Sequence, residues 1–195
     1  MTEDKNGNKL FIVFEGLDGS GKTTLAKMLA ADLNGLYIAS PPPFLETDGI
    51  RSIMDEKVSL ETRFLYYLLA NSCVSDEIKK ARKSKIVICD RYLHSTLSIH
   101  KLLGVNINID VDSLGLEKPD ISFFISVSDE KVRRRRIKER KKKTKYDTIK
   151  EDKDFRKQYI NYFQQRKEFI FIDTTNENKK ESLEKIKAEI LRRIR

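Results

Sequence analysis

The sequence predicts an α/β fold of three layers, in which a five-stranded parallel sheet carries helices on both faces. Short apolar runs alternate with amphipathic helical patterns along the whole chain, which is typical of strand–helix–strand units. The first apolar run is compact and stops at a glycine-rich turn, as buried parallel strands do. No linker or repeat divides the 195 residues, so we expect one domain spanning 1–195.

The expected strands are five short apolar runs, each followed by a polar or turn-forming segment. The first run stops at Glu15, and the second is halted by Pro41, Pro42 and Pro43. Strands of a parallel sheet that is covered on both faces are continuously apolar rather than alternating. The expected strands occupy residues 10–14, 36–39, 86–89, 121–127 and 169–172.

The expected helices follow these strands, because apolar residues there recur at the spacing of one helical face. Ser128 is expected to cap the basic helix after the fourth strand. The other helices span 24–33, 60–82, 93–103, 155–167 and the C-terminal segment, and 106–118 is a short helix or a loop. The side chains expected to point inward are Leu25, Met28, Leu29 and Leu33, then Phe64, Leu65, Leu68, Leu69 and Ile78, and finally Leu183, Ile186, Ile190, Leu191 and Ile194.

The composition excludes several classes of protein. Hydrophobic residues make up 39% of the chain and charged residues 35%, which is the balance of a folded protein rather than a disordered one. No run approaches the roughly 18 apolar residues of a membrane span, and the polar N-terminus has no apolar signal core. Cys73 and Cys89 form no CxxC pair and are expected to be buried free thiols. We therefore expect a cytoplasmic protein without membrane contact.

Residues 16–23 match the pattern G-x-x-x-x-G-K-[ST] between an expected strand and an expected helix. The glycines let the backbone wrap an anion, and the helix that begins near Lys22 adds the positive end of its dipole. Lys22 is expected to reach the β- and γ-phosphates of ATP, and the Thr23 hydroxyl to bind Mg²⁺. A chance glycine turn is the alternative, and it would occur in about 1 in 100 such chains. The residues expected to hold ATP are Gly16, Leu17, Asp18, Gly19, Ser20, Gly21, Lys22, Thr23 and Thr24.

Asp90 and Arg91 follow the third expected strand. Because ligand sites of parallel sheets lie beyond the carboxyl ends of the strands, Asp90 is expected to face the phosphate loop. Its carboxylate would orient Mg²⁺ or a water bound to it, and Arg91 would clamp a phosphate with two hydrogen bonds. Asp-Arg pairs are common at strand ends and by themselves indicate no function. The phosphate loop in the same chain is the reason to assign this pair to Mg²⁺ and phosphate.

The formal charge of +9 is concentrated in one short segment. Residues 131–145 contain eleven basic side chains and one acidic side chain, Glu139, so the rest of the chain is close to neutral. A nucleic-acid-binding protein would spread its charge along a face and interleave it with aromatic side chains that stack on bases. We therefore expect a basic lid over about 133–150 that closes on a small anion, with most of its charges in solvent and no stable nucleic acid partner.

The chain resembles the thymidylate kinase family of P-loop nucleoside monophosphate kinases over about residues 10–194. The segments that carry the resemblance are residues 11–24, Asp90-Arg91-Tyr92, Ser95-Thr96-Leu97, Lys118-Pro119-Asp120 and Phe171-Ile172-Asp173. It implies the P-loop NTPase fold, a homodimer packed through helices, and transfer of the γ-phosphoryl group of ATP to dTMP with Mg²⁺ as cofactor. It also implies that Asp18 contacts the 3′-hydroxyl of the acceptor sugar and that Arg91 bridges the donor and acceptor phosphates.

The resemblance assigns two lid arginines to the phosphates. Gly19 and Ser20 fill the positions where some relatives place an arginine in the phosphate loop, so the lid has to supply one. Charge that stabilises a transferring phosphoryl group is worth about 10³–10⁵ in rate. Arg140 is expected to be catalytic and Arg136 to bind ATP, with Lys141, Lys142 and Lys143 as alternatives.

The acceptor side departs from the family pattern. The arginine that follows the second strand in the family is replaced by Ser40-Pro41-Pro42-Pro43-Phe44. The positions of the base-stacking aromatic and the base-binding arginine become Leu68 and Ser72, and the polar base contact becomes His100. A register that differs by one turn would bring Phe64, Tyr66 or Tyr67 to the base instead. These residues do not by themselves support thymine as the base.

Tyr159 is expected behind the deoxyribose, with Tyr162 and simple core packing as alternatives. Two other functions also stay open at this stage. A deoxynucleoside kinase would need a glutamate base after the second strand, where Ser40, Pro41 and Pro42 stand. A nucleotide-dependent nucleic-acid-binding protein would use the phosphate loop without kinase turnover. Drift to another small acceptor is the third possibility.

Overall fold

The structure is a computed structural model that describes residues 7–46, 49–138 and 145–194. Its strands form a parallel sheet in the order β2-β3-β1-β4-β5. The strands are β1 (Phe11–Glu15), β2 (Leu36–Ala39), β3 (Val87–Asp90), β4 (Ile121–Ser126) and β5 (Phe169–Asp173). This confirms the predicted five-stranded parallel sheet, with boundaries within two residues of those expected.

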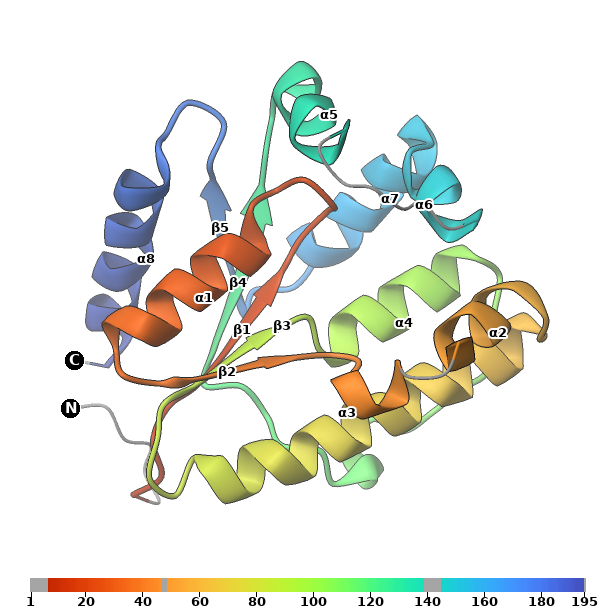
Figure 1. The fold of residues 1–195 in the computed structure, drawn as a ribbon, viewed down its shortest axis with the longest axis horizontal. Helices are drawn as coiled ribbons and strands as arrows, with labels where there is room; N and C mark the ends of the chain where they lie inside the picture. The colour runs from red at the N-terminus through yellow and green to blue at the C-terminus, as the bar shows by residue number, and fades with distance from the viewer. Residues whose placement is uncertain (1–6, 47–48, 139–144, 195) are drawn as a thin grey trace.

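Helices cover both faces of the sheet, as predicted (Figure 1). Helices α1 and α8 lie on one face, and α3, α4 and α7 lie on the other. The helices are α1 (Lys22–Asp32), α2 (Ile50–Glu56), α3 (Leu60–Ala81), α4 (Leu93–Leu102), α5 (Glu130–Lys138), α6 (Lys145–Lys150), α7 (Lys153–Gln164) and α8 (Lys179–Arg193). Among the described residues, no helix combines the length and the hydropathy that a bilayer span requires.

The central strand β1 is buried on both faces because its alternating side chains enter two different cores. Ile12 and Phe14 pack with apolar residues of α1 and α8. Phe11 and Val13 pack with residues of α3 and with Leu93 at the start of α4. The continuous apolar run in the sequence reflects this double burial.

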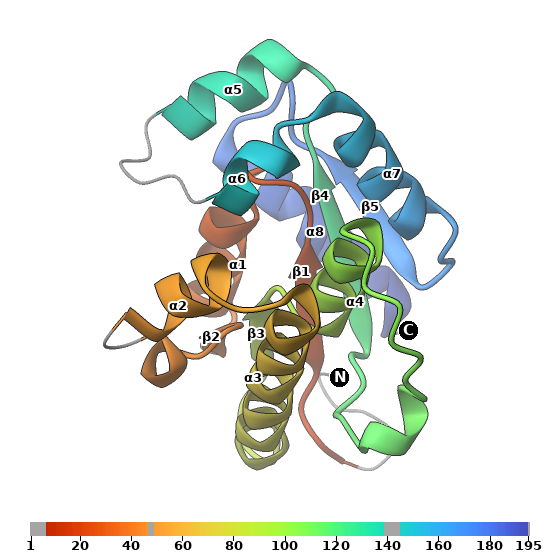
Figure 2. The same cartoon turned by 90° about the vertical axis from the view of Figure 1, so that its right-hand side faces the viewer.

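The register of the sheet brings three loops to one edge. Phe14 pairs with Asp90 on one side of β1, and Glu15 pairs with Phe124 on the other. Because the strands are parallel, the turns that follow β1, β3 and β4 all leave from this carboxyl edge. Helix α5 lies at the same end in both views (Figures 1 and 2).

Two of the inward positions predicted for α3 are wrong. Leu65 and Leu69 are 53% and 55% exposed, whereas Phe64 and Ile78 are buried as expected. Polar side chains occupy part of the buried face, among them Arg63 and Asn71, so the apolar pattern alone misplaces that face. In α8, Leu183, Ile186 and Ile190 are buried as expected. Leu191 is 55% exposed, so the inward position predicted for it is also wrong.

Several local predictions also need correction. Ser128 does not cap α5, because its hydroxyl pairs with Thr175, 3.0 Å away. Asp129 takes that place, since its carboxylate accepts a hydrogen bond from the Lys131 amide at 2.7 Å. Residues 106–118 form a loop with a 3₁₀ turn at Asp112–Leu114. The sequence patterns did not indicate the short helices α2 and α6. Cys73 and Cys89 are free thiols, as expected, although only Cys89 is fully buried.

The burial of leucines in the outer helices can be tested by one matched pair of substitutions. Leu29→Ala removes a fully buried side chain from α1 and is expected to lower the free energy of unfolding by about 2–5 kcal/mol. Leu191→Ala removes an exposed side chain from α8 and should change it by less than about 0.5 kcal/mol. Urea denaturation measures both values, and equal losses would contradict the orientation described for α8.

Candidate active site

The turn after β1 forms a tight loop around a space lined by backbone amides. Gly16 has a φ of +146°, and a Cβ atom there would lie 2.2 Å from the carbonyl oxygen of Ile125. Gly21 ends the loop with a φ of +92°, and α1 begins at Lys22. The first amides of α1 are therefore directed at the loop, in the arrangement that binds phosphate.

The loop residues expected to hold ATP gather at this point. Lys22 is buried, with its Nζ atom 3.3 Å from the Leu17 carbonyl oxygen and 3.6 Å from Asp18. The Ser20 amide donates to the Leu17 carbonyl at 3.2 Å and closes the turn. Thr24 is exposed on the outer side of the loop. The sequence motif thus has the strand–loop–helix context that its interpretation requires.

A pocket of about 400 Å³ adjoins the loop on the side of α8. Its volume is in the range of sites that bind small ligands, roughly 300–1,000 Å³. Arg136 lines it and donates to the hydroxyl and the carbonyl of Thr174, at 3.1 and 3.0 Å. The residues around it are Gly19, Ser20, Gly21, Thr24, Leu25, Arg136, Thr174, Glu177, Lys179 and Ser182. The structure therefore places Arg136 beside the phosphate loop.

Asp90 and Thr23 face each other across the same edge. The Thr23 hydroxyl donates to Oδ2 of Asp90, and Oδ1 of Asp90 is buried without a hydrogen-bond partner in the described part of the chain. A buried carboxylate oxygen with a free lone pair beside a hydroxyl suits a hard cation such as Mg²⁺. No cluster of three His, Cys, Asp or Glu that could hold a metal occurs within 7–46, 49–138 and 145–194. These two residues therefore fit a Mg²⁺ ion that takes its other ligands from phosphate and water.

Arg91 lies between the phosphate loop and a second pocket. Its guanidinium donates to Asp18 at 2.6 Å, to the Ser95 hydroxyl at 3.0 Å and to the Tyr159 hydroxyl at 3.4 Å. Burial alone would lower the pKa of Arg91, but Asp18, Tyr159, Glu15 and Asp90 together outweigh burial and raise it. Arg91 is therefore a permanent cation at this position. Tyr159 is buried behind it, with its pKa raised to about 12 chiefly by burial.

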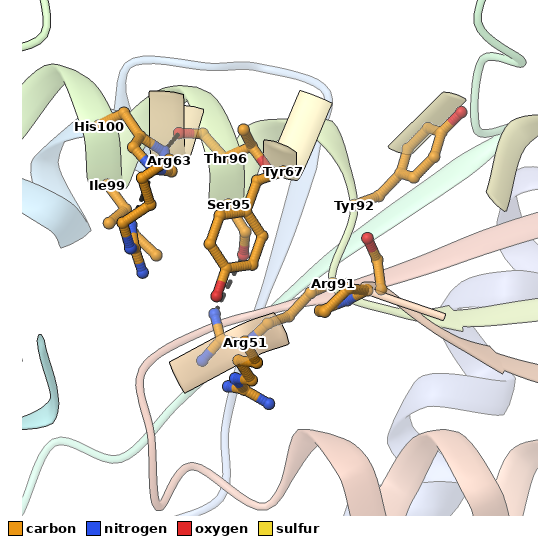
Figure 3. Close-up of a pocket in the computed structure, with 11 residues that line it drawn as sticks. Arg51, Arg63, Tyr67, Arg91, Tyr92, Ser95, Thr96, Ile99 and His100 are labelled. Atoms are coloured by element: carbon orange, nitrogen blue, oxygen red, sulfur yellow. Dashed lines mark hydrogen bonds between the residues drawn. The ribbon is translucent and has the colours of Figure 1, made fainter. Parts of the chain in front are cut away.

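The second pocket opens between α2, α3 and α4 (Figure 3). Arg51 and Arg91 lie at one end of the group of side chains in the figure, and Arg63 and His100 lie together at another. Tyr92 points away from them. The lining residues are Ser40, Pro41, Arg51, Arg63, Tyr67, Arg91, Tyr92, Ser95, Thr96, Ile99 and His100. One end of the pocket thus contains the two cations Arg51 and Arg91. The other end, called the polar end below, contains Arg63 and His100, and the ring of Tyr67 also lines the pocket.

Arg63 is held rigidly at the polar end. Its Nε atom donates to Asp55 at 2.8 Å, and its Nη1 atom donates to Nε2 of His100 at 2.7 Å. Nδ1 of His100 lies 2.8 Å from the Thr96 carbonyl, which only accepts, so Nδ1 carries the proton. The guanidinium also lies over the rings of Tyr67 and Tyr146, at 4.6 and 3.8 Å from their centroids.

The cavity beside these side chains measures only about 70 Å³. Pockets that bind small ligands usually exceed about 300 Å³. Tyr146 comes from α6, the last part of the basic lid segment, and its ring is buried against Arg63. A nucleotide-sized ligand therefore needs α6 or the Arg63 side chain to move aside.

The structure does not bring Leu68 and Ser72 to this pocket, which corrects the assignment made from the sequence. Arg63 and Tyr67 are four residues apart and share one face of α3, whereas Leu68 and Ser72 lie one residue, or about 100°, further round. Leu68 packs against the core beneath the sheet, and Ser72 is exposed. His100 does line the pocket, and Tyr159 lies next to Arg91.

Sequence reasoning missed Arg51 and Arg63 and mentioned Tyr67 only as a possible substitute. The four-residue spacing of Arg63 and Tyr67 was a usable signal, because it places a cation and an aromatic ring on one helical face. Arg51 gave no such signal, since α2 reaches the pocket only in the folded chain.

The described part of the basic segment docks on the phosphate loop. Arg133 is 2% exposed and donates to the Asp18 carbonyl at 3.0 Å. It also pairs with Glu130 and Glu151, at 2.9 and 3.0 Å, so it joins α5 to the turn between α6 and α7. Arg140 and Lys141, Lys142 and Lys143 lie outside the described residues.

Comparisons with known proteins agree with this geometry. A family model described as thymidylate kinase matches residues 14–186. A probable thymidylate kinase of Methanocaldococcus jannaschii is 35% identical over 191 residues, covering 94% of this chain and 95% of that protein. A thymidylate kinase of Mycoplasma mobile is 32% identical, with coverage of 66% and 71%. The solved thymidylate kinase of Candida albicans superimposes with a TM-score of 0.71 at 19% identity, covering 94% and 91%, and supports the fold.

Proposed function

Since this chain belongs to the thymidylate kinase family, we propose that it transfers the γ-phosphoryl group of ATP to dTMP and forms dTDP and ADP. The observation that carries the proposal is the position of Arg91. It lies between the phosphate loop, through Asp18, and the pocket that contains Arg51 and Arg63. A donor phosphate on the loop and an acceptor phosphate in the pocket would meet at this guanidinium.

The proposed reaction is an in-line displacement at the γ-phosphorus. An oxygen of the dTMP phosphate forms the new bond, and the bond to the β–γ bridging oxygen breaks as ADP leaves. The attacking oxygen is already an anion, so no general base is needed. The chain therefore has to align two polyanions and neutralise the charge that passes between them. Lys22 and Arg91 are the residues proposed for this task, with a lid arginine such as Arg140.

Magnesium belongs to the same proposal. Thr23 and Asp90 would hold the ion, directly or through water, and the ion would supply charge neutralisation at the β- and γ-phosphates. The buried Oδ1 atom of Asp90, for which the described residues provide no hydrogen bond, supports this role. The pocket lined by Arg136, Thr174 and Lys179 is the proposed location of the ATP nucleoside.

We propose that Arg63 and Tyr67 read the acceptor base in this chain. Among the described residues, Asp55 accepts from Nε of Arg63 and His100 accepts from one N–H of Nη1, so the donors of Nη2 are available for a base oxygen. Thymine presents the O4 acceptor on this edge, whereas cytosine presents an amino donor that a guanidinium repels. Tyr67 offers a ring face, and Arg51 is proposed to replace the monophosphate arginine that is missing after β2. The thymine preference thus gains support from residues that the sequence pattern did not single out.

The alternative functions are not favoured. The relatives found are named thymidylate kinases, and the family model matches most of the chain. A deoxynucleoside kinase would place a carboxylate near the acceptor hydroxyl, yet none of the described residues that line the pocket is an aspartate or a glutamate. Asp55, behind the lining, is paired with Arg63 and Tyr67.

We also propose a homodimer that packs through α3, and a cytoplasmic location. Leu65 and Leu69 are four residues apart and more than half exposed, so they form an apolar strip on the outer face of α3. A second copy of this chain would cover the strip. Free thiols at Cys73 and Cys89 are the form that a reducing compartment maintains.

Replacing the loop lysine tests the phosphate site. Lys22→Ala should abolish nearly all turnover of ATP and dTMP, because it removes the cation proposed for the β- and γ-phosphates. Lys79→Ala, which changes an exposed lysine on α3, should leave turnover unchanged. A coupled ADP-release assay measures both, and circular dichroism checks the fold. Retained activity in a folded Lys22→Ala protein would refute the assignment.

Replacing Arg63 tests base recognition. Arg63→Lys keeps a charge for Asp55 but loses the planar donors, so kcat/KM for dTMP should fall about 10–100-fold. The preference for dTMP over dCMP should fall as well, because the repulsion of the cytosine amino group is weakened. Ser72→Ala is the matched control, since the sequence register places that residue at the base and the structure does not. If Ser72→Ala changed the preference and Arg63→Lys did not, the base would lie against Ser72, as the family pattern indicated, and the proposal for Arg63 would be wrong.

The proposed dimer is tested on the same helix. Leu69→Glu adds a charge to the strip and should convert the protein into a monomer at micromolar concentration. Leu191→Glu, on the equally exposed leucine of α8, should leave the dimer intact. Sedimentation equilibrium gives the mass of each species. A wild-type monomer, or a dimer lost only in Leu191→Glu, would contradict the α3 interface.

A further inference from the structure

We infer that Glu15 is a positioning residue that fixes Arg91 for phosphoryl transfer, an inference that rests on the role proposed above for Arg91. Glu15 ends β1, immediately before the phosphate loop, and it is 0% exposed. It does not line the acceptor pocket. Its effect on the reaction would therefore pass through its neighbours.

The carboxylate of Glu15 organises the start of α4. Oε1 accepts the amides of Tyr92 and Ser95 at 3.0 and 3.1 Å, and Oε2 accepts the Ser95 hydroxyl. The residue at the N-cap position of α4, Tyr92, makes no capping bond with its own side chain. Glu15 thus caps α4 from a different strand and replaces the local cap that the sequence lacks.

Ser95 connects Glu15 to the guanidinium of Arg91. Its hydroxyl proton is directed at Glu15, so a lone pair of its oxygen is left to accept from Nη1 of Arg91 at 3.0 Å. Nη2 of Arg91 then donates to Asp18 at 2.6 Å. A continuous chain of hydrogen bonds therefore runs from Glu15 through Ser95 and Arg91 to the phosphate loop.

The backbone of Arg91 needs such support. Its φ is +67°, in the left-handed region that non-glycine residues rarely occupy. On one side Asp90 is fixed by the pairing of β3 with β1 and β2. On the other side Glu15 holds the amides of Tyr92 and Ser95. Strained conformations persist where both flanks are determined in this way, and they are concentrated at functional sites.

Charge adds to the geometry. Burial raises the pKa of Glu15, whereas the guanidinium of Arg91 and the donors from Ser95 and Tyr92 oppose this rise. These groups favour the ionised carboxylate. An amide at this position would direct its own N–H group at Ser95 and would disturb the orientation of that hydroxyl.

Asp120 provides a matched control at the opposite end of the same sheet. Its carboxylate also accepts a backbone amide, that of Phe11 at 2.7 Å, and it pairs with Arg82 at 2.8 Å. Asp120→Asn and Glu15→Gln make the same chemical change, from a carboxylate to an amide, although Asp120 is more exposed than Glu15. Only Glu15 is connected to Arg91.

The test compares steady-state kinetics of the two variants with ATP and dTMP. Glu15→Gln should lower kcat about 10–100-fold with KM changed much less, because a displaced Arg91 is felt most in the transition state. Asp120→Asn should keep the wild-type kcat whatever it does to thermal stability. Ser95→Ala should lower kcat in the same way, and its effect should not multiply with that of Glu15→Gln, since both act through one chain of contacts.

A second measurement does not require turnover. The NMR signals of the Arg91 guanidinium report its rotation, which should be slow in the wild type and in Asp120→Asn but fast in Glu15→Gln. If the wild-type protein does not phosphorylate dTMP, the proposed function fails while this measurement still decides the role of Glu15. Wild-type kcat and slow rotation in Glu15→Gln would overturn the inference. Should Glu15→Gln not fold, unchanged kcat and rotation in Ser95→Ala would overturn it equally.

Discussion

The parallel pairing of β1 with β3 is the constraint on which the rest of the site depends. It places Phe14 beside Asp90, so the loop after β1 and the turn after β3 leave the sheet side by side. Thr23 then meets Asp90, and Asp18 meets Arg91, although 67 and 73 residues separate them in sequence. The two strands are apolar on both faces, and this burial gives the edge its rigidity. Groups that have to lie within a hydrogen bond of each other are thereby held by the most rigid part of the fold.

The charges gathered at this edge would destabilise the fold if they were isolated, because ions in a protein interior lose their hydration. Asp18 pairs with Arg91, Asp55 with Arg63, and Arg133 with both Glu130 and Glu151. Each pair recovers part of the desolvation cost. Each pair also fixes the orientation of the two side chains, since a planar guanidinium donates hydrogen bonds only in fixed directions. The same interactions that make the charges tolerable therefore orient them. Arg133 thereby holds α5 on the phosphate loop, where its guanidinium donates to the Asp18 carbonyl.

The sequence predicted the parts of the site that depend on local order. Residues 16–23 needed only a strand before them and a helix after them, and Asp90 needed only the end of a strand. Prediction was less successful where a helix presents mixed chemistry to a core. Arg63 and Asn71 are buried through partners in α2 and α4, so hydrophobic spacing placed Leu65 and Leu69 inward. The match to the family pattern was likewise out of register when it assigned the base contacts to Leu68 and Ser72. An error of one residue on a helix is a rotation of about 100°, which exchanges a pocket-facing side chain for one facing the core or the solvent.

We propose that Arg51 takes the place of the arginine that is missing after β2 and binds the acceptor phosphate. A phosphate responds to the position of a cation rather than to the element that supplies it, and α2 brings Arg51 to the pocket that Arg91 lines. The phosphate end of the site follows strands whose pairing is fixed by backbone hydrogen bonds. The base end is built on α2, α3 and α6, which pack through side chains. Changes of sequence at the base end therefore leave the transfer chemistry undisturbed. This division is what the proposal for Arg63 and Tyr67 requires, because the base-binding residues change there while the phosphate motif stays unchanged.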